Sequence, residues 1–506
     1  MTYGKSAGFL CVQEKIRNFA PLIRGSVVAT IRLDKMSGAP GYDILSSLFF
    51  YYCKSMKTEN LGLDYANGRI GRLFSKIFFP TLLGMMFNAL ITIVDGIFVG
   101  RGVGPDGIAA VNIIAPLFMV TTGIGLMFGI GASVAAGISL STKDYTKANS
   151  NLTSAFIFAT SLIAILVVVA LLFTDSITKL LGSSERLHDN TTGYLLLLLP
   201  ALIPLMWQSI GMMVIRLDGS PKYAMMCNII PSVLNIGLDW WMVFPLGMGV
   251  RGAALATSIS CIVGGIMAVV YFRYSYVLKF TRNIKDFGSN ILMQARIGSA
   301  AFVTEIAMSI MMFIGNYVFM KTFGEDGVAA YSIACYLFPL IFMINNAVAQ
   351  SAQPIISYNF GCANFLRVQK ALRVSILVGC ICGAIVTGSI ALGTRGIVSL
   401  FILPECEAGR IATSGLPIFA LAGIFFAVNI AFIGYYQSIK KAGLALTLTL
   451  LRGMIFLVPF FLLLTHLFPA WGMWAAVPLS EFLTLIIVLS IYYNTYESSR
   501  RNHKVA

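Results

Sequence analysis

The feature that most constrains the fold of this chain is a series of twelve long apolar runs, each bounded by Gly, Pro or charged residues. About 20 apolar residues in a helix are enough to cross the hydrocarbon core of a bilayer. Only 11% of the residues are charged, whereas soluble domains carry about 25%. A soluble enzyme, a nucleic-acid-binding protein and a disulfide-rich secreted domain are therefore excluded. The expected spans are 76–100, 107–139, 149–173, 190–215, 222–244, 250–273, 295–320, 326–358, 371–393, 408–437, 442–465 and 471–494.

Charged residues in the connections between these runs predict how the chain is oriented. Connections after the even-numbered runs, together with the C-terminal tail, hold seventeen basic residues and four acids. Connections after the odd-numbered runs hold seven basic residues and eight acids. Because Lys and Arg accumulate on the cytoplasmic side of membrane proteins, we expect a multi-pass protein of the cell (inner) membrane with both termini in the cytoplasm.

The chain also contains an internal repeat. One constant offset along the sequence places GPDGIAAV (104–111) on GEDGVAAY (324–331) and RGAALA (251–256) on WGMWAA (471–476). A single offset at two places indicates a duplication, and six spans per unit give both units the same orientation in the membrane. The sequence therefore predicts an all-α polytopic membrane protein of two pseudo-symmetric six-helix lobes. These are an N-terminal lobe at 76–275, a cytoplasmic linker at 276–294, a C-terminal lobe at 295–494 and a cytoplasmic tail at 495–506.

Residues 1–75 have mixed polarity and no apolar run long enough to span a membrane. We interpret them as a disordered cytoplasmic extension. Met56 begins a segment that leads directly into the first run. An alternative is therefore that residues 1–55 are translated from a start codon set too far upstream.

Five ionisable residues remain inside the predicted spans: Asp95, Asp239, Glu305, Arg452 and Glu481. Each costs at least about 2.5 kcal/mol at the centre of a bilayer, so each is a candidate functional residue. Arg452 and Glu481 have opposite charge and lie on consecutive runs, which favours a structural ion pair. For Asp95, Asp239 and Glu305 a functional role competes with a buried structural one.

Neighbouring polar residues sharpen the prediction for the two aspartates. Asn235 precedes Asp239 by one helical turn, and Thr257 lies near the start of the sixth run. Carboxylate, amide and hydroxyl oxygens can bind a hard cation, whereas two adjacent carboxylates can instead hold a proton. The offset of the repeat places Asp95, Asn235, Asp239 and Thr257 on Gly315, Ile455, Pro459 and Val477. Because the second lobe lacks this chemistry, we expect a site for H⁺ or Na⁺ in the N-terminal lobe and no other metal.

A second polar group lies in the C-terminal lobe. Asn346, Gln350, Gln353 and Ser357 share one face of the eighth run, and Glu305 lies one run earlier. A polar stripe in hydrocarbon must face a cavity or another helix. We predict that Glu305, Asn346, Gln350 and Gln353 line a substrate cavity, with hydrogen bonding between helices as the alternative.

Several segments have a recognisable pattern when taken together. They are FFPTLLGMMFNALITIVDGIFVG, RLDGSPKYAMMCNIIPSVLNIGLD, GVRGAALAT, QPIISYNFG, LLRGMIFLVPF and WGMWAAVPLSEFLTL. Over residues 70–495 the chain resembles the multidrug and toxic compound extrusion (MATE) family of the MOP flippase superfamily. The resemblance implies two six-helix lobes arranged as a V around a central cavity. It also implies export of mostly cationic or amphipathic compounds driven by H⁺ or Na⁺.

The resemblance further implies roles for single residues. Asp95, Asn235, Asp239 and Thr257 match the cation site of the family's N-terminal lobe, and Glu305 matches an acidic position in the seventh span of some members. One departure is Gln437, which stands where one branch has an acid, so the N-terminal lobe carries more weight here. Pro80, which precedes Asp95 on the first run, prepares a bend that a change at the Asp95 carboxyl could alter.

Two functions from different classes remain. One is a cation-coupled antiporter for multidrug efflux by alternating access; the other is a flippase for a lipid-linked saccharide. A flippase cavity needs Arg and Lys to neutralise phosphates, yet Arg452 alone remains within the predicted spans, so the antiporter is favoured. We expect no enzyme activity, because no nucleophile–base pair is present, and no cofactor besides the coupling ion. The expected partners are the lipid bilayer and small organic substrates, without nucleic acid, for a monomeric protein.

Overall fold

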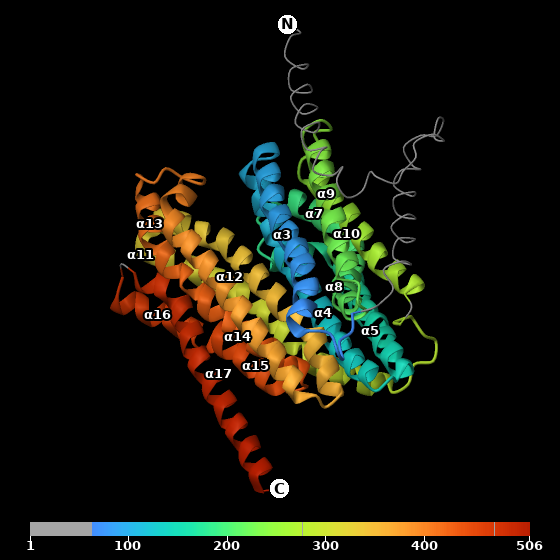
Figure 1. Cartoon of the computed structure of the whole chain (residues 1–506). Coiled ribbons are helices and arrows are strands. Elements are labelled where there is room, and N and C mark those ends of the chain that lie inside the picture. The colour runs from blue at the N-terminus through green and yellow to red at the C-terminus, as the bar shows by residue number, and fades with distance from the viewer. Residues whose placement is uncertain (1–62, 276, 470, 506) are drawn as a thin grey trace, which may run out of the picture. The chain divides into compact units, whose positions relative to one another are not determined.

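The computed structural model describes residues 63–275, 277–469 and 471–505, and these residues form helices joined by turns, without a β-strand (Figure 1). The helices of the first half are α3 (Ile70–Gly102), α4 (Pro105–Ser141), α5 (Tyr145–Leu172), α6 (Thr174–Leu180), α7 (His188–Leu198), α8 (Leu202–Leu217), α9 (Pro221–Val243) and α10 (Gly249–Tyr274). Those of the second half are α11 (Phe287–Gly361), α12 (Phe365–Ser399), α13 (Glu407–Ala420), α14 (Ala422–Ser438), α15 (Ala442–Leu450), α16 (Leu457–Leu467) and α17 (Gly472–Val505). A π-helical turn at Leu451–Ile455 joins α15 to α16.

Ten helical stretches of the described chain are long and apolar enough to cross a membrane. One of them, α11, has 75 residues, but Gly324 within it has a non-helical backbone (φ 64°, ψ −148°), so α11 comprises two spans. Gly104, the equivalent position in the first unit of the repeat, also has a positive φ of 94°. The 23 residues of α9 are long enough for a further span, although α9 is not among the ten. The predicted all-α, multi-span fold is therefore confirmed.

The internal repeat is also present in the backbone geometry. Lys143 and Ala363, which are equivalent under the offset of the repeat, both have left-handed φ angles, of 60° and 54°. The residues that follow them, Asp144 and Asn364, each cap the next helix by accepting a hydrogen bond from a backbone N–H three residues on. The same turn and the same cap thus end the second span and start the third in each half.

The segment that leads into each half is bound to the opposite half. Before α3, the carbonyl oxygen of Tyr65 accepts hydrogen bonds from Asn359 Nδ2 and Arg367 Nη2, both at 3.0 Å. Before α11, the carbonyl oxygen of Lys285 accepts a hydrogen bond from the hydroxyl of Ser150, on α5, at 3.0 Å. The two halves are therefore interlocked at the end of the bundle that carries the connections 142–144, 218–220, 275–286, 362–364 and 439–441. We call this end the basic end.

These contacts correct one predicted boundary. Residues 63–75 were assigned to a disordered extension, but α3 begins at Ile70 and the Tyr65 side chain is buried. The burial of Tyr65 between α8 and α11 explains why this segment is ordered. The remainder of the predicted extension, including residues 1–55, lies outside the described residues. At the other terminus α17 continues to Val505, so the predicted tail extends the last helix.

Asp218, directly after α8, fastens the linker between the halves. Its carboxylate accepts hydrogen bonds from the hydroxyls of Tyr271 and Ser275, at 2.6 and 2.5 Å, and from the backbone N–H of Leu278 at 3.0 Å. Desolvation raises the pKa of the Asp218 carboxyl to about 6, although these three donors act in the opposite direction.

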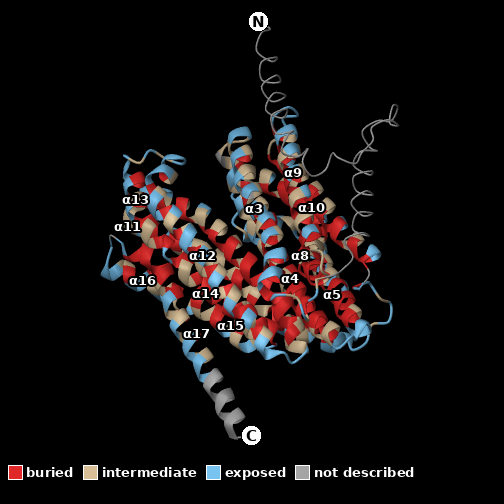
Figure 2. Ribbon diagram, in the orientation of Figure 1, coloured by how far each residue is buried: buried red, intermediate tan, exposed pale blue. Residues whose placement is uncertain are grey.

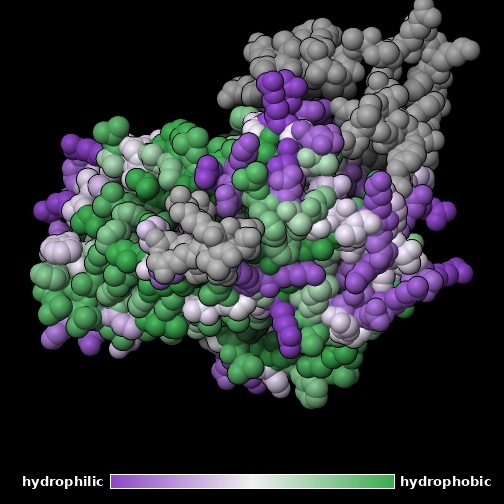
Figure 3. Space-filling model, turned by 60° about the horizontal axis from the view of Figure 1, so that its bottom comes forward, coloured by the Kyte–Doolittle hydropathy of each residue, from purple (hydrophilic) through white to green (hydrophobic). Residues whose placement is uncertain are grey.

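The distribution of burial fits a membrane environment. Buried residues fill the interior between the helices (Figure 2). Many large apolar side chains are nevertheless exposed, among them Leu172, Phe313 and Leu392. Figure 3 brings the basic end forward and shows hydrophilic side chains gathered there between wide hydrophobic surfaces. An apolar belt of this kind requires lipid rather than water around it.

Close packing at two glycines joins α4 to the first span of α11. A Cβ atom at Gly298 would overlap the backbone of Met127, and a Cβ at Gly131 would overlap the backbone of Gln294. Small residues allow helix backbones to approach closely in membranes. The two halves therefore meet along a tight α4–α11 contact, and both helices contribute residues to the cavity that contains Glu305.

Candidate cation and substrate sites

The predicted pair of aspartates is brought together by α3 and α9. Asp239 is fully buried and Asp95 is half-buried. Their carboxyl groups are close enough for each to influence the charge of the other. Among the described residues, neither oxygen of Asp239 nor Oδ1 of Asp95 has a hydrogen-bond partner. Because an ionised carboxylate is only an acceptor, two such groups can satisfy each other only by sharing a proton or a cation.

The other two predicted cation-site residues lie in the same region of the first half. Asn235, buried on α9, donates through Nδ2 to the hydroxyl oxygen of Thr257 on α10 at 3.4 Å. This bond leaves the carbonyl oxygen of Asn235 available as an acceptor. The structure thus brings all four predicted residues together from three helices.

Sequence reasoning missed one residue of this group. Tyr194 on α7 is buried beside Thr257 and lies within electrostatic range of both aspartates. It stands in the segment TTGYLLLL, where a tyrosine looks like an ordinary core residue. No pattern in the sequence distinguishes a tyrosine beside the aspartates from a tyrosine that only fills the core.

Pro80 lies inside α3, which remains helical from Ile70 to Gly102. A proline within a helix removes one backbone hydrogen bond, so it weakens the helix at that point. The proposed role of Pro80 in bending remains a prediction.

The predicted stripe in the second half faces a small cavity. Glu305, Asn346, Gln350 and Gln353 on α11 all line it, together with Gln437 on α14. The cavity volume is ≈ 40 Å³, which is room for about three water molecules. Drug-sized ligands need about 300–1,000 Å³, so a larger guest requires the two halves to move apart.

The stripe also makes the hydrogen bonds that were the alternative interpretation. Gln353 Nε2 donates to the carbonyl oxygen of Ile130, on α4, at 3.3 Å, whereas Asn346 Nδ2 donates at 3.2 Å to that of Phe342, within α11 itself. Gln353 therefore bridges the halves while it lines the cavity. Both interpretations describe part of the stripe.

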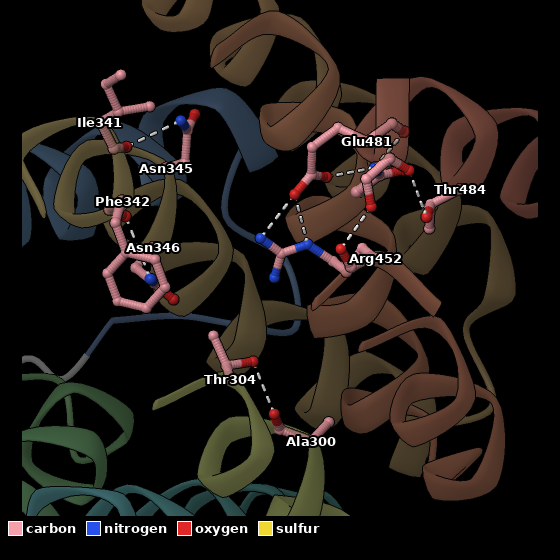
Figure 4. Close-up of polar contacts among 11 residues, drawn as sticks. Ala300, Thr304, Ile341, Phe342, Asn345, Asn346, Arg452, Glu481 and Thr484 are labelled. Atoms are coloured by element: carbon pink, nitrogen blue, oxygen red, sulfur yellow. Dashed lines mark hydrogen bonds and ion pairs between the residues drawn. The ribbon is translucent and has the colours of Figure 1, made fainter. Parts of the chain in front are cut away.

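The predicted ion pair is formed in the interior of the second half (Figure 4). Arg452 Nη2 lies 2.8 Å and Nε 2.9 Å from Glu481 Oε1, and the two side chains are 6% and 4% exposed. Glu481 Oε2 accepts a further bond from Asn429 Nδ2 at 2.7 Å. The guanidinium also lies 4.3 Å from the ring centre of Phe426. Arg452 belongs to the π-helical turn, a local distortion that often accompanies functional or strained positions.

Arg452 is not the sole basic residue buried within the helices, which corrects the sequence-based count. Arg216 in the last turn of α8 is 2% exposed. The sequence places Arg216 in the connection after the fourth run, because it ends an apolar stretch and Asp218 follows two residues later.

Among the described residues, no group of three or more His, Cys, Asp or Glu side chains could hold a metal ion. Ligands for Na⁺ would have to come from the mixed oxygen set of Asp95, Asp239, Asn235 and Thr257.

The family model MatE matches residues 80–241 and 300–463, one segment in each half. The chain belongs to the MATE family. Its curated relatives include the multidrug export protein MepA of Staphylococcus haemolyticus, which is 26% identical over 446 residues that cover 86% of this chain and 97% of MepA. MepA of Staphylococcus aureus is 26% identical over 423 residues, covering 82% and 91% of the two chains. As MATE proteins are membrane transporters, the predicted family and the absence of enzyme activity are both confirmed.

Solved MATE structures have the same fold. A multidrug resistance MATE transporter of the MOP superfamily in an outward-facing conformation superposes with a TM-score of 0.82 at 22% identity, over 88% of this chain and 99% of that one. A MOP superfamily transporter from Pyrococcus furiosus gives a TM-score of 0.81 at 22% identity, over 87% and 98%. The predicted two-lobe arrangement of helices is thus that of the family.

Proposed function

We propose that this MATE transporter is an antiporter that exports small amphipathic, cationic compounds in exchange for H⁺ or Na⁺ by alternating access. The observation that carries the proposal is the Asp95–Asp239 pair, in which both oxygens of Asp239 and Oδ1 of Asp95 lack a hydrogen-bond donor among the described residues. The names of the MepA relatives, multidrug export proteins, support export of small organic molecules.

The pair provides a physical basis for coupling. Repulsion between two close carboxylates favours uptake of a proton or of Na⁺ between them. Asn235, one turn before Asp239 on α9, and its hydrogen-bond partner Thr257 offer further oxygens in the same region. Uptake changes the local charge on α3 and α9, so it biases the equilibrium between two conformations. A substrate that prefers one of those conformations is then thermodynamically linked to the ion.

The cavity supports the cationic substrate class. Its described lining contains the carboxyl group of Glu305 and four side-chain amides, but neither Lys nor Arg. This composition attracts a cation. The one basic group beside it in the described structure, Arg216, is bonded to Gln350, and a single basic group is fewer than the diphosphate of a lipid-linked saccharide requires, which weighs against the flippase. The basic end, by the distribution of Lys and Arg, is cytoplasmic in the cell membrane.

The test is transport by the full chain in proteoliposomes, with H⁺ and Na⁺ gradients imposed separately. We expect Asp95→Asn and Asp239→Asn each to abolish gradient-driven export of ethidium while binding of ethidium persists, because the amide keeps the shape and removes the charge. Asp189→Asn is the matched control, since Asp189 is 90% exposed and bound by Arg251 alone. Export at wild-type rates by both variants would overturn the proposal, and loss of folding would assign the pair a structural role.

A further inference from the structure

Arg216 is a buried cation that forms no ion pair with any acid in the described part of the chain. Its Nη1 donates to Gln350 Oε1 at 2.6 Å and approaches Met213 Sδ at 3.5 Å, while its Nε has no hydrogen-bond partner in the described structure. Burying a charge without a counter-ion is costly, and an intramembrane ionisable residue is a functional candidate by default. The arrangement therefore needs an explanation beyond packing.

The Arg216–Gln350 hydrogen bond joins the two halves and reaches the cavity. Arg216 belongs to α8 in the first half, whereas Gln350 belongs to α11 in the second half and lines the cavity beside Glu305 and Asn346. The guanidinium binds one of the two lone pairs of the Gln350 carbonyl oxygen, which is the sole acceptor atom of that side chain. In this conformation Gln350 is a poor hydrogen-bond acceptor for a cationic substrate, since the positive charge of Arg216 already lies beside its carbonyl oxygen.

The backbone of Arg216 is held at the same place. The hydroxyl of Tyr65 donates to the carbonyl oxygen of Arg216 at 2.9 Å. The carbonyl oxygen of Tyr65 in turn accepts from Asn359 and Arg367 of the second half. The main chain of Arg216 is thus linked to the second half through Tyr65, and its side chain is linked to the second half through Gln350. Separation of the halves at the basic end must therefore break the bond to Gln350.

We propose that Arg216 is a positioning residue that controls how Gln350 binds substrate. While the basic end is closed, Arg216 is hydrogen-bonded to the carbonyl oxygen of Gln350; when that end opens, this bond breaks and the oxygen becomes free to accept another donor. Gln350 then accepts a hydrogen bond from a cationic substrate only when the cavity faces the cytoplasm. Substrate is held more tightly on the cytoplasmic side than on the outside, which is the difference in affinity that export requires. This inference rests on the proposed function, and it explains how the affinity of the cavity for a cationic substrate changes between the two conformations.

The test is equilibrium binding of ethidium, a cation, and Nile red, a neutral dye, to the purified full chain without any ion gradient. Arg216→Met keeps the length of the side chain and removes the charge, and replacing a buried charge by an apolar group preserves folding. We expect this variant to bind ethidium about tenfold more tightly, the scale of one hydrogen bond to a charged group, with Nile red binding changed less than twofold. Arg216→Lys, which keeps a cationic donor, should restore values near those of the wild type.

A second variant tests whether Gln350 is the intermediary. In the double variant Arg216→Met/Gln350→Leu the gain for ethidium should disappear, because the released acceptor is no longer present. Equal changes for both dyes, a Lys variant that behaves like the Met variant, or a gain that survives in the double variant would each overturn the inference. If the wild-type protein exports ethidium but Arg216→Met leaves its binding unchanged, this inference alone fails. If the wild-type protein neither binds nor exports ethidium, the proposed function fails with it.

Discussion

Removal of one partner from the Arg452–Glu481 pair should strongly destabilise the protein, whereas removal of both should not. Glu481→Gln leaves the guanidinium of Arg452 in an environment where the side chain is 6% exposed. An uncompensated buried charge costs about 3–5 kcal/mol. The remaining contact with the ring of Phe426 offsets only about 0.5–2 kcal/mol of this loss.

The double variant Arg452→Met/Glu481→Leu has no buried charge. Replacement of a buried ion pair by apolar residues of similar volume is often neutral or stabilising, by about 1–4 kcal/mol. Here that gain is reduced, because Asn429 Nδ2 loses its bond to Glu481 Oε2 and keeps only the one to the Glu481 carbonyl oxygen. We therefore expect the double variant to lie within about 2 kcal/mol of the wild type.

The assay is thermal unfolding of the three purified proteins in one detergent, with ethidium export measured in parallel. Glu481→Gln should lower the melting temperature by roughly 3–5 °C, since a chain of this length loses about 1 °C per kcal/mol, and the double variant should recover most of that loss together with export. If the double variant folds as well as the wild type but does not export, the pair takes part in transport. If Glu481→Gln is as stable as the wild type, the argument from buried charge is wrong.

The cavity, the linker and the α4–α11 contact each support one more prediction. Glu305→Gln should weaken ethidium binding by about 1–2 kcal/mol, since a hydrated cavity screens the lost charge; fluorescence titration should show little change for a neutral dye, and an equal loss for both would mean a structural role. The pKa of Asp218 is raised in the folded protein to about 6, so its contribution to stability is complete below about pH 4 and is lost as pH rises through 6. Thermal unfolding between pH 5 and 7.5 should therefore show a fall in stability that Asp218→Asn reduces, and identical pH dependence in both proteins would contradict this. Gly298→Ala should prevent correct folding because its Cβ would overlap Met127, as judged by size-exclusion chromatography, whereas the control Gly288→Ala, with open space around it, should elute like the wild type.

The sequence predicts the helical membrane fold and the repeat, because hydrocarbon imposes long apolar runs and duplication leaves matching turns. It also selects Asp95, Asp239, Arg452 and Glu481, since a charge inside an apolar run is conspicuous. It does not separate cavity lining from helix–helix bonding at Gln353, because a stripe on one helix does not reveal what lies opposite.

The omissions have a common cause. Tyr194 and Arg216 acquire their roles from neighbours that are distant in the sequence, Thr257 and Gln350. The same is true of Tyr65, whose short polar segment gives no sign that it contacts the second half. Local patterns report local structure, and they do not reveal contacts between residues that are distant in the sequence.

The interlocked entry segments have a consequence for how the protein is made. The residue that binds Tyr65, Asn359, lies 294 positions further along the chain. At the usual rate of about 5–20 residues per second, a ribosome needs roughly 15–60 s to reach it. In the later part of that interval the first half is complete, but the first turns of α3 still lack their contacts with the second half. A nascent chain stalled shortly before Asn359 should therefore present the segment 63–69 to proteases or to an insertion chaperone, and a chain stalled well beyond it should not.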